Sequence, residues 1–326
     1  MSNLVFSGIQ PSGQLHIGNY LGAIINWLEL QEKYPCIFAI VDYHSISVPF
    51  NPQEKRQEIK ELALDFLALG INPKKSQIII QSHLPEHLEL AWILGTITPL
   101  SWLERIPTFK SKKQQHQQYL NLGLLSYPVL MSADILLYKA NLVPVGEDQL
   151  PHIELTNQIA KRFNQMFGKT FPEIKPILTV QSRIMGLNRP NDKMSKSLGK
   201  SNYLALTDLP KTIRQKIKSA TTDSDNQIKL DWEKKPGISN LLSIYHLFTK
   251  KTIDQICQQY QNKGYAQFKS DLAEIIIEQL SPFQNKRQRL SNKPGYINKI
   301  ISNGEKKAKK IAQATLREVK QKIGLL

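Results

Sequence analysis

Apolar residues in the first eighty positions form short, nearly uninterrupted runs, separated by longer segments with helical spacing. An uninterrupted run is typical of a strand that is buried on both faces of a sheet. Between the runs, residues 18–28 and 53–69 carry apolar side chains three and four positions apart, as amphipathic helices do. Strands that alternate with helices predict a parallel α/β sheet. The predicted strands occupy residues 4–9, 36–41 and 77–80.

Helical spacing dominates the chain beyond residue 120. Tyr127, Met131 and Asp134 lie four and three positions apart and share one face of a predicted helix. Residues 187–202 are polar, basic and rich in turn residues, so we expect a loop there. Further helical patterns follow this loop, and the last, from about residue 305 to 323, is rich in lysine. The pattern predicts an N-terminal α/β region, a basic loop and a helical C-terminal region.

Composition narrows the class of protein only slightly. A chain of 326 residues, 41% of them hydrophobic and 21% charged, fits about two folded domains and excludes disordered, collagen-like or disulfide-scaffold proteins. The two cysteines are far apart and neither lies in a CxxC pair, which favours a reducing compartment. Neither an apolar stretch of about 18 residues nor a signal-peptide pattern is present, so we expect a cytoplasmic protein without membrane contact.

The positive charge is concentrated in the second half of the chain. The formal net charge is +16 in total, and it is −3 over residues 1–100, +7 over 101–200 and +12 over 201–326. Such surfaces attract polyanions through steering and counterion release. A lysine bias in an AT-rich genome would produce the same excess. Charge alone therefore leaves nucleic-acid binding and coding bias equally open.

A first candidate site lies where the first predicted strand passes into the first helix, over residues 11–19. Ligands of parallel sheets bind beyond the carboxyl ends of the strands, and a helix N-terminus offers free N–H groups to phosphate. Gly18 would let the backbone pass close to a nucleotide, and His16 could donate a hydrogen bond to phosphate oxygens. By itself, a helix-starting turn with a surface histidine explains this segment equally well.

A second candidate site is Lys193-Met194-Ser195-Lys196-Ser197 in the basic loop. Two lysines three positions apart can reach a pyrophosphate and offset its charge as it leaves. Lysine runs are usually solvated, but a fixed pentapeptide arises by chance in only about one sequence per 10⁴. The nearby Gly199-Lys200-Ser201 ends like a P-loop, yet Met194 stands where that loop requires glycine, so we reject a P-loop.

These two motifs together resemble those of class I aminoacyl-tRNA synthetases, in which a HIGH-type motif, here His16-Ile17-Gly18-Asn19, precedes KMSKS. The fourth position is Asn19 rather than His, as is common in the tryptophanyl branch. Further segments resemble bacterial tryptophanyl-tRNA synthetases, and the resemblance covers essentially the whole chain. These segments are FSGIQPSG at 6–13, MSADILLY at 131–138, VGEDQ at 145–149 and KPGISNLL at 235–242.

The resemblance implies a fold, a reaction and partners. It implies a Rossmann-type catalytic domain over residues 1–192, ending at the KMSKS loop, and a loop plus helical tRNA (anticodon)-binding region over 193–326 whose last helix could pack back on the catalytic domain. The reaction is activation of L-tryptophan by ATP and Mg²⁺ to tryptophanyl-adenylate and pyrophosphate, followed by transfer to tRNA(Trp). The enzyme would be a homodimer, and Mg²⁺ would be held mainly by ATP phosphates rather than by protein ligands.

The resemblance also assigns site residues. The catalytic set is His16, Lys112, Lys193 and Lys196. ATP contacts are Gln10, Pro11, Ser12, Gly18, Asn19, Gly146, Glu147, Asp148, Ile184, Lys193, Met194, Ser195, Lys196 and Ser197, with Ile184 acting through its backbone. Tryptophan contacts are Phe6, Tyr127, Met131, Asp134, Val143 and Gln149. Because the indole N–H is only a donor, the pocket requires a buried acceptor, and Asp134 supplies one.

Three alternatives stay open at this point. A tyrosyl-tRNA synthetase shares the fold and a similar set of residues, although the segments at 6–13 and 131–138 favour tryptophan. A nucleotidylyltransferase of a small molecule shares the HIGH-type site but would not need a long basic helical region. An inactive RNA-binding paralogue is disfavoured by the intact His16, Lys193 and Asp134. Amino-acid-dependent exchange of pyrophosphate into ATP would separate these classes of protein.

Overall fold

The computed structural model describes residues 3–107, 119–178 and 184–326. The chain divides into two compact units. The second unit consists of Gln14–Ile25 and Val180–Asn292, and the remaining segments form the first: Met1–Gly13, Asn26–Thr179 and Lys293–Leu326. This division differs from the expected boundary between residues 192 and 193. A bridge between His16 and Ala205 joins the first helix region to the second unit, and the last helix returns to the first.

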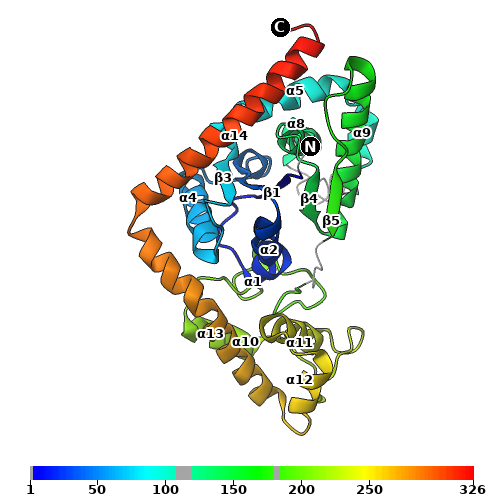
Figure 1. The fold of residues 1–326 in the computed structure, drawn as a ribbon. Coiled ribbons are helices and arrows are strands. Elements are labelled where there is room, and N and C mark those ends of the chain that lie inside the picture. Colours follow the sequence, from blue (N-terminus) through cyan, green and yellow to red (C-terminus); the bar gives the residue numbers. More distant parts are fainter. Residues whose placement is uncertain (1–2, 108–118, 179–183) are drawn as a thin grey trace. The chain divides into compact units, whose positions relative to one another are not determined.

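The first unit contains a five-stranded parallel sheet in the order β3-β2-β1-β4-β5 (Figure 1). This order confirms the predicted Rossmann-type α/β class, and all three predicted strands are present. All five residues of β2 are buried, as the apolar run indicated. The strands are β1 (Val5–Ile9), β2 (Cys36–Ile40), β3 (Ser76–Ile80), β4 (Leu142–Val145) and β5 (Lys175–Leu178).

Helices pack on this sheet and carry several of the predicted site residues. Helix α4 (Pro52–Leu69) begins at an Asn51 cap and ends at Gly70, whose φ of 112° is unfavourable for other residues. This confirms the predicted helix over 53–69. The other helices and short turns of this unit are α2 (Ile25–Lys33, whose first residue belongs to the second unit), α3 (Asp42–Ser45), η2 (Gln81–His83), α5 (Glu86–Ile97), α6 (Leu100–Glu104), α8 (Leu122–Leu136), η4 (Glu147–Gln149), α9 (Leu150–Phe167) and α14 (Pro294–Lys322).

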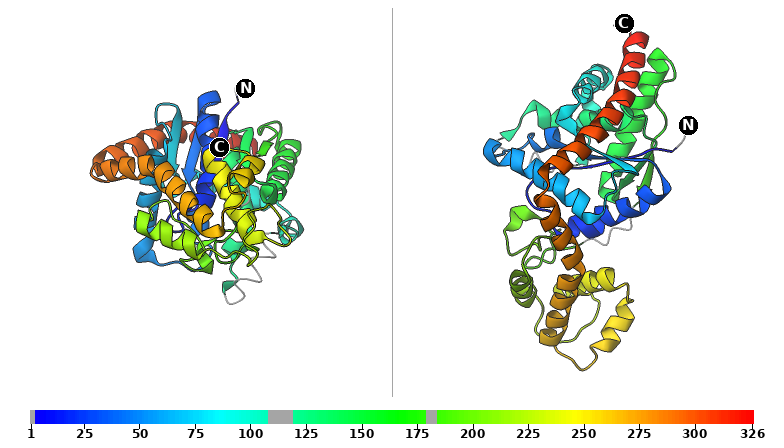
Figure 2. Two further views of the ribbon diagram at one scale, coloured as in Figure 1. Left: turned by 90° about the horizontal axis from the view of Figure 1, so that it is seen from below. Right: turned by 60° about the vertical axis from the view of Figure 1, so that its left-hand side comes forward.

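Helix α14 packs against β3, an edge strand of the sheet, as both Figure 1 and Figure 2 show. It begins at Pro294, eleven residues before the predicted start at Glu305. The reason is Gly304, which resembles a helix breaker in the sequence but permits close packing here. A Cβ added at Gly304 would lie 2.3 Å from the carbonyl oxygen of Ile78 in β3. The backbone of β3 thus occupies the place that a side chain at position 304 would take.

The second unit is mainly helical. The segment predicted to be a helix from Gly18 begins here as α1 (Ile17–Asn19) and the π-helix η1 (Tyr20–Ile24). The expected loop at 187–202 is largely irregular and contains only the short turn η5 (Lys196–Leu198). The longer helices of the second unit are α10 (Pro210–Ser219), α11 (Pro236–Thr249), α12 (Ile253–Gln259) and α13 (Tyr265–Ser291). Across the described part of the chain, no helix is both long and apolar enough to cross a membrane.

Candidate active site

Two predicted ATP-binding segments lie at the carboxyl ends of neighbouring strands in the first unit. Gln10 and Pro11 follow β1, and Gly146 and Glu147 follow β4. Strands β1 and β4 pair in parallel, and the strand order reverses between them. Such a switch point is the usual ligand position of an open α/β sheet. Beside the buried Pro11 and Gly146, the side chains of Gln10, Ser12, Glu147 and Asp148 are exposed.

A second group of predicted residues surrounds His16 in the other unit. A Cβ added at Gly18 would lie 3.0 Å from the imidazole of His16 and 3.8 Å from the Cβ of Ile184. The missing side chain of Gly18 thus makes room for the His16 ring, whereas we had expected it to make room for a nucleotide. Asn19 accepts the backbone N–H of His16 at 3.1 Å and fixes this turn. The structure brings His16, Gly18 and Ile184 together.

His16 is held neutral by its surroundings. Its side chain is buried, and its Nδ1 has no hydrogen-bond partner among the described residues. Burial, together with the positive charges of Lys196 and Lys193, lowers the pKa of His16 to about 4. At neutral pH the imidazole therefore carries one N–H donor and no charge. The two lysines that the motif singled out are close enough to act on this ring.

The lysine loop starts from a short backbone pairing. Met185 is bridged in antiparallel fashion to Lys193, and the N–H of Met194 donates to the carbonyl of Ile184 at 3.0 Å. The Met194 side chain is buried, whereas those of Lys193 and Ser197 are exposed. Ser195 Oγ accepts the N–H of Ser197 at 3.3 Å and begins the η5 turn. The backbone at the start of the loop is therefore fixed by hydrogen bonds, and the side chain of Lys193 there is exposed.

Asp134 lies at the centre of a buried polar cluster in the first unit. It extends from α8 and is 2% exposed. His44 Nε2 lies 2.7 Å from its Oδ2, and both Gln81 Nε2 and His87 Nδ1 lie 2.7 Å from its Oδ1. His44 and Gln81 follow β2 and β3, so this cluster also lies beyond carboxyl ends of strands. We call Asp134, His44, Gln81 and His87 the Asp134 cluster.

These donors keep Asp134 ionised. Burial alone would raise its pKa, but the hydrogen bonds from His44 and His87 outweigh that effect and lower the pKa to about 2. An ionised carboxylate has about four acceptor positions, and three are used here. One position on Oδ2 is left for a further donor.

The other predicted tryptophan contacts also belong to the first unit. Phe6 stacks on Tyr138 with ring centroids 5.6 Å apart, and the Tyr138 hydroxyl lies 2.8 Å from His87 Nε2. Tyr127 is buried with its ring near His44. Val143 is part of the same hydrophobic core, and Met131 packs against it. Gln149 is half-buried in η4, where its side chain donates to Asp148 at 2.9 Å.

Some residues of this region were not anticipated, and one predicted residue lies outside the described part of the chain. The sequence pattern did not point to His44, Gln81 or His87. His44 does carry a signal, because it follows a fully buried strand at its carboxyl end, where parallel sheets hold functional side chains. His87 lies within an apolar helix and carries no such signal. Lys112 falls in 108–118, outside the described residues, so its role stays a prediction.

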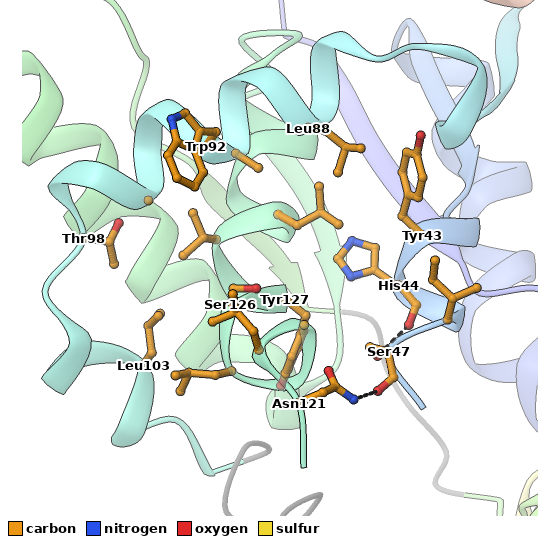
Figure 3. A pocket seen from close by; sticks show the side chains of 18 of the residues that line it. Tyr43, His44, Ser47, Leu88, Trp92, Thr98, Leu103, Asn121, Ser126 and Tyr127 are labelled. Atoms are coloured by element: carbon orange, nitrogen blue, oxygen red, sulfur yellow. Dashed lines mark hydrogen bonds between the residues drawn. The ribbon is translucent and has the colours of Figure 1, made fainter. Parts of the chain in front are cut away.

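A cavity of about 790 Å³ adjoins the Asp134 cluster (Figure 3). His44 and Tyr127 line it, and Leu88, Trp92 and Leu103 form much of its apolar wall. Asn121 donates to the carbonyl of Ser47 at 3.0 Å and closes one side. Of the six predicted tryptophan contacts, Tyr127 alone lines this cavity. The cavity therefore shares Tyr127 with the predicted tryptophan pocket and His44 with the Asp134 cluster, and the rest of its lining lies outside the predicted contacts.

Comparison with known proteins agrees with this geometry. The family model described as "tRNA synthetases class I (W and Y)" matches residues 2–281. Tryptophan–tRNA ligases of Caldanaerobacter subterraneus and Bacillus anthracis are 47% and 45% identical to the chain, each over 99% of it and 98% of the relative.

Solved structures give the same result. The tryptophanyl-tRNA synthetase of Mycoplasma pneumoniae has a TM-score of 0.89 at 34% identity, covering 100% of this chain and 99% of that one. That of Campylobacter jejuni, in complex with ADP and tryptophan, has a TM-score of 0.85 at 35% identity and covers 99% and 100%. An archaeal tyrosyl-tRNA synthetase, at 17% identity, shares the fold only. The chain belongs to the class I tRNA synthetase family of the tryptophan and tyrosine enzymes.

Proposed function

We propose that the protein is a tryptophan–tRNA ligase, which activates L-tryptophan with ATP and transfers it to tRNA(Trp) in the cytoplasm. The observation that carries this proposal is the 47% identity to a tryptophan–tRNA ligase over 99% of the chain. The buried acceptor of the Asp134 cluster supports tryptophan, because its open position suits the indole N–H. The tyrosyl structures share only the fold.

The first half-reaction requires no protein nucleophile. The tryptophan carboxylate attacks the α-phosphorus of ATP in line, the bond to the bridging oxygen breaks, and pyrophosphate leaves with its electron pair. Catalysis then consists of positioning and of stabilising the charge that develops. We assign the stabilising charge to Lys193 and Lys196. The neutral His16 donates one hydrogen bond to phosphate oxygen.

The remaining ATP contacts follow the strand ends. Gln10, Pro11 and Ser12 after β1, and Gly146, Glu147 and Asp148 after β4, hold the nucleotide in this proposal. Mg²⁺ would be bound mainly by the ATP phosphates and would supply charge neutralisation there. Among the residues that the structure describes, no group of three His, Cys, Asp or Glu side chains is placed to hold a metal ion.

Exchange of labelled pyrophosphate into ATP tests this proposal directly. We expect exchange that depends on tryptophan and is about 100-fold weaker with tyrosine, since the smaller phenol ring leaves part of an indole-sized apolar pocket unfilled. Aminoacylation of total tRNA with labelled tryptophan is the second step of the test. Exchange that responds to tyrosine, or to neither amino acid, would contradict the proposal.

We further propose that exposed lysines of α14 contribute to tRNA binding. Lys306, Lys307, Lys309 and Lys310 are all exposed on a helix whose opposite face is buried. In α10, by contrast, Arg214 pairs with Glu274 and Lys216 with Asp208. Each phosphate that a lysine neutralises adds to the salt dependence of binding. Changing the four α14 lysines to glutamate should weaken tRNA binding and reduce its salt slope, while pyrophosphate exchange persists.

A matched control for this test is Lys211→Glu with Lys218→Glu in α10, where both lysines are exposed. If the α10 pair weakens tRNA binding and the α14 set does not, α10 is the contact. If neither set changes the affinity, the lysine excess reflects composition rather than binding.

We also propose a homodimer that uses the apolar cavity beside the Asp134 cluster. Trp92 and Leu122 at its rim are 78% and 76% exposed. No Lys, Arg, Asp or Glu is among the described residues that line it. Two copies with a net charge of +16 each repel one another, so a contact is most favourable where the surface carries no charge. A second copy of the chain fits this face.

Light scattering after size exclusion tests the homodimer. The wild type should have twice the chain mass of 37.3 kDa. Trp92→Glu with Leu122→Glu should shift the protein to a single chain mass, because each glutamate would be buried without a partner. Met166→Glu is the control, since Met166 is 52% exposed outside this cavity. A doubly substituted protein that keeps the double mass would contradict this interface.

A further inference from the structure

The segment KPGISNLL at 235–242 marks the family but has no role in the mechanism described so far. In the structure it forms the first turns of α11. Asn240 within it is 1% exposed, and its carboxamide faces the backbone of Met185. Its Oδ1 accepts the N–H of Met185 at 2.9 Å, and its Nδ2 donates to the carbonyl of Met185 at 2.9 Å. One side chain thus satisfies both backbone groups of a residue 55 positions away.

Met185 is also the residue that pairs with Lys193. The hydrogen bonds of that pairing belong to its neighbours: Gly186 N–H donates to the Asp192 carbonyl at 2.8 Å, and Met194 N–H donates to Ile184. In such an antiparallel pair the N–H and C=O of the central residue point away from the partner strand. The N–H and C=O of Met185 therefore face Asn240, whose side chain forms the hydrogen bonds that a third strand would otherwise form.

Helix α11, which carries Asn240, is fixed by contacts at its N-terminus. A Cβ added at Gly237 would lie 2.1 Å from the carbonyl oxygen of Thr221, so α11 packs directly on that backbone. Lys235 is 7% exposed, and its ammonium is bonded to Asp225 and lies 3.1 Å from Asp223. These contacts fix the N-terminus of α11. Asn240 can accordingly impose a defined position on Met185.

We propose that Asn240 is a positioning residue for the lysine loop. It holds Met185 so that the pairing with Lys193 keeps its register, and this register determines where the loop starts. The role deepens the proposed function and rests on it, because it matters for catalysis only if Lys193 stabilises the leaving pyrophosphate. Asn240 touches no reacting atom in this assignment. It acts through the backbone of Met185, and its Nδ2 also lies 3.4 Å from the carbonyl oxygen of the adjacent Gly186.

The test uses Asn240→Ala in the full-length protein, with Ser243→Ala as its control. Ser243 lies on the same helix, and its hydroxyl donates to the carbonyl of Ser239. Asn240→Ala leaves two backbone groups without partners, so we expect kcat/KM for ATP in pyrophosphate exchange to fall about tenfold. KM for tryptophan should stay at the wild-type value. Ser243→Ala should change neither constant.

Hydrogen exchange gives a readout that does not depend on activity. The amides of Met185 and Met194 should exchange about tenfold faster in Asn240→Ala than in Ser243→Ala. If the alanine protein does not fold, Asn240→Asp replaces it, because aspartate can still accept from Met185 N–H but cannot donate to its carbonyl. Unchanged amide exchange, or an equal rise of KM for tryptophan and for ATP, would overturn the proposal. A wild type without tryptophan-dependent exchange would refute the proposed function instead, whatever the amides do.

Discussion

The Asp134 cluster and the lysine loop differ in the surroundings of their charged groups. Asp134 is fully buried, and three donors hold its negative charge within 2.7 Å. Lys193 is exposed, and burial together with Lys196 and Lys193 lowers the pKa of His16, which stays neutral. In the first case the fold itself compensates the charge. In the second case the fold places two lysines near His16 and keeps that histidine uncharged.

This difference indicates two kinds of task. A compensated carboxylate with one open acceptor position recognises the shape and donor pattern of a ligand, and it changes little when the ligand binds. The exposed Lys193 and the half-buried Lys196, beside a neutral histidine, gain most when an anion arrives. We therefore expect substitutions in the Asp134 cluster to change the choice of amino acid. Substitutions in the loop should change the rate of adenylate formation.

The largest effect should come from the loop. Lys193→Ala or Lys196→Ala should slow adenylate formation by about 10²–10³-fold, because a preorganised charge that acts mainly in the transition state is lost. Single-turnover adenylation at saturating ATP measures this rate, and tryptophan binding measured separately should be nearly unchanged. The exposed Lys200 in the same loop provides the control, as Lys200→Ala. Near-normal adenylation in the Lys193 and Lys196 variants would remove the contrast between the two regions.

The neutrality of His16 should be visible in the pH dependence of stability. The pKa of His16 is about 4 in the folded protein, against 6.5 for the free side chain, so the unfolded chain binds the extra proton first. The free energy of unfolding should then fall by up to about 3 kcal/mol as the pH drops from 6.5 to 4. Urea titrations at several pH values measure this decline. His16→Asn should show a shallower decline, and an identical one would contradict the assignment.

Removal of Asp134, the buried acceptor, should lower the rate somewhat less than removal of Lys193 or Lys196. Asp134→Ala should lower kcat/KM for tryptophan by about 10–10²-fold, while KM for ATP stays constant. The variant should also lose discrimination against a benzothiophene analogue, which lacks the indole N–H. Glu318→Ala is the control for general destabilisation, because Glu318 pairs with Lys139 in the same unit. A folded Asp134→Ala protein with wild-type preference would make Asp134 a structural carboxylate only.

The smallest effect should come from Tyr138. Its hydroxyl lies 2.8 Å from His87 Nε2 and so favours the tautomer whose Nδ1–H donates to Asp134. Tyr138→Phe keeps the stack on Phe6 and removes only the hydroxyl. We expect KM for tryptophan to rise about 2–10-fold without a change in kcat. A lower kcat with constant KM would place Tyr138 in the chemistry rather than in recognition.

The sequence predicted the elements that depend on local pattern. The buried strand over 36–41 and the helix closed by Gly70 need only apolar spacing and a glycine at positive φ. The start of α14 could not be predicted, because the close approach of Gly304 to Ile78 joins positions more than 200 residues apart. The division into two units could not be predicted either, because the bridge between His16 and Ala205 forms only in the folded chain.

The candidate site shows the same limit. Asp134 was predictable as a buried acceptor because a carboxylate amid apolar residues needs partners. The identity of those partners was not, because His44, Gln81 and His87 come from three other elements that the sheet topology brings together. Asn240 was visible only as part of a family motif. Its contact with Met185 required the folded backbone.

The packing of α14 on β3 also has a consequence for synthesis of the chain. Strand β3 ends at Ile80, whereas the helix that covers it begins at Pro294. At about 5–20 residues per second, a ribosome needs about 10–40 seconds to make the intervening segment. Throughout that time the nascent sheet has an uncovered edge strand, the kind of surface on which chains pair wrongly and aggregate. The first unit cannot close during translation until nearly the whole polypeptide has been made.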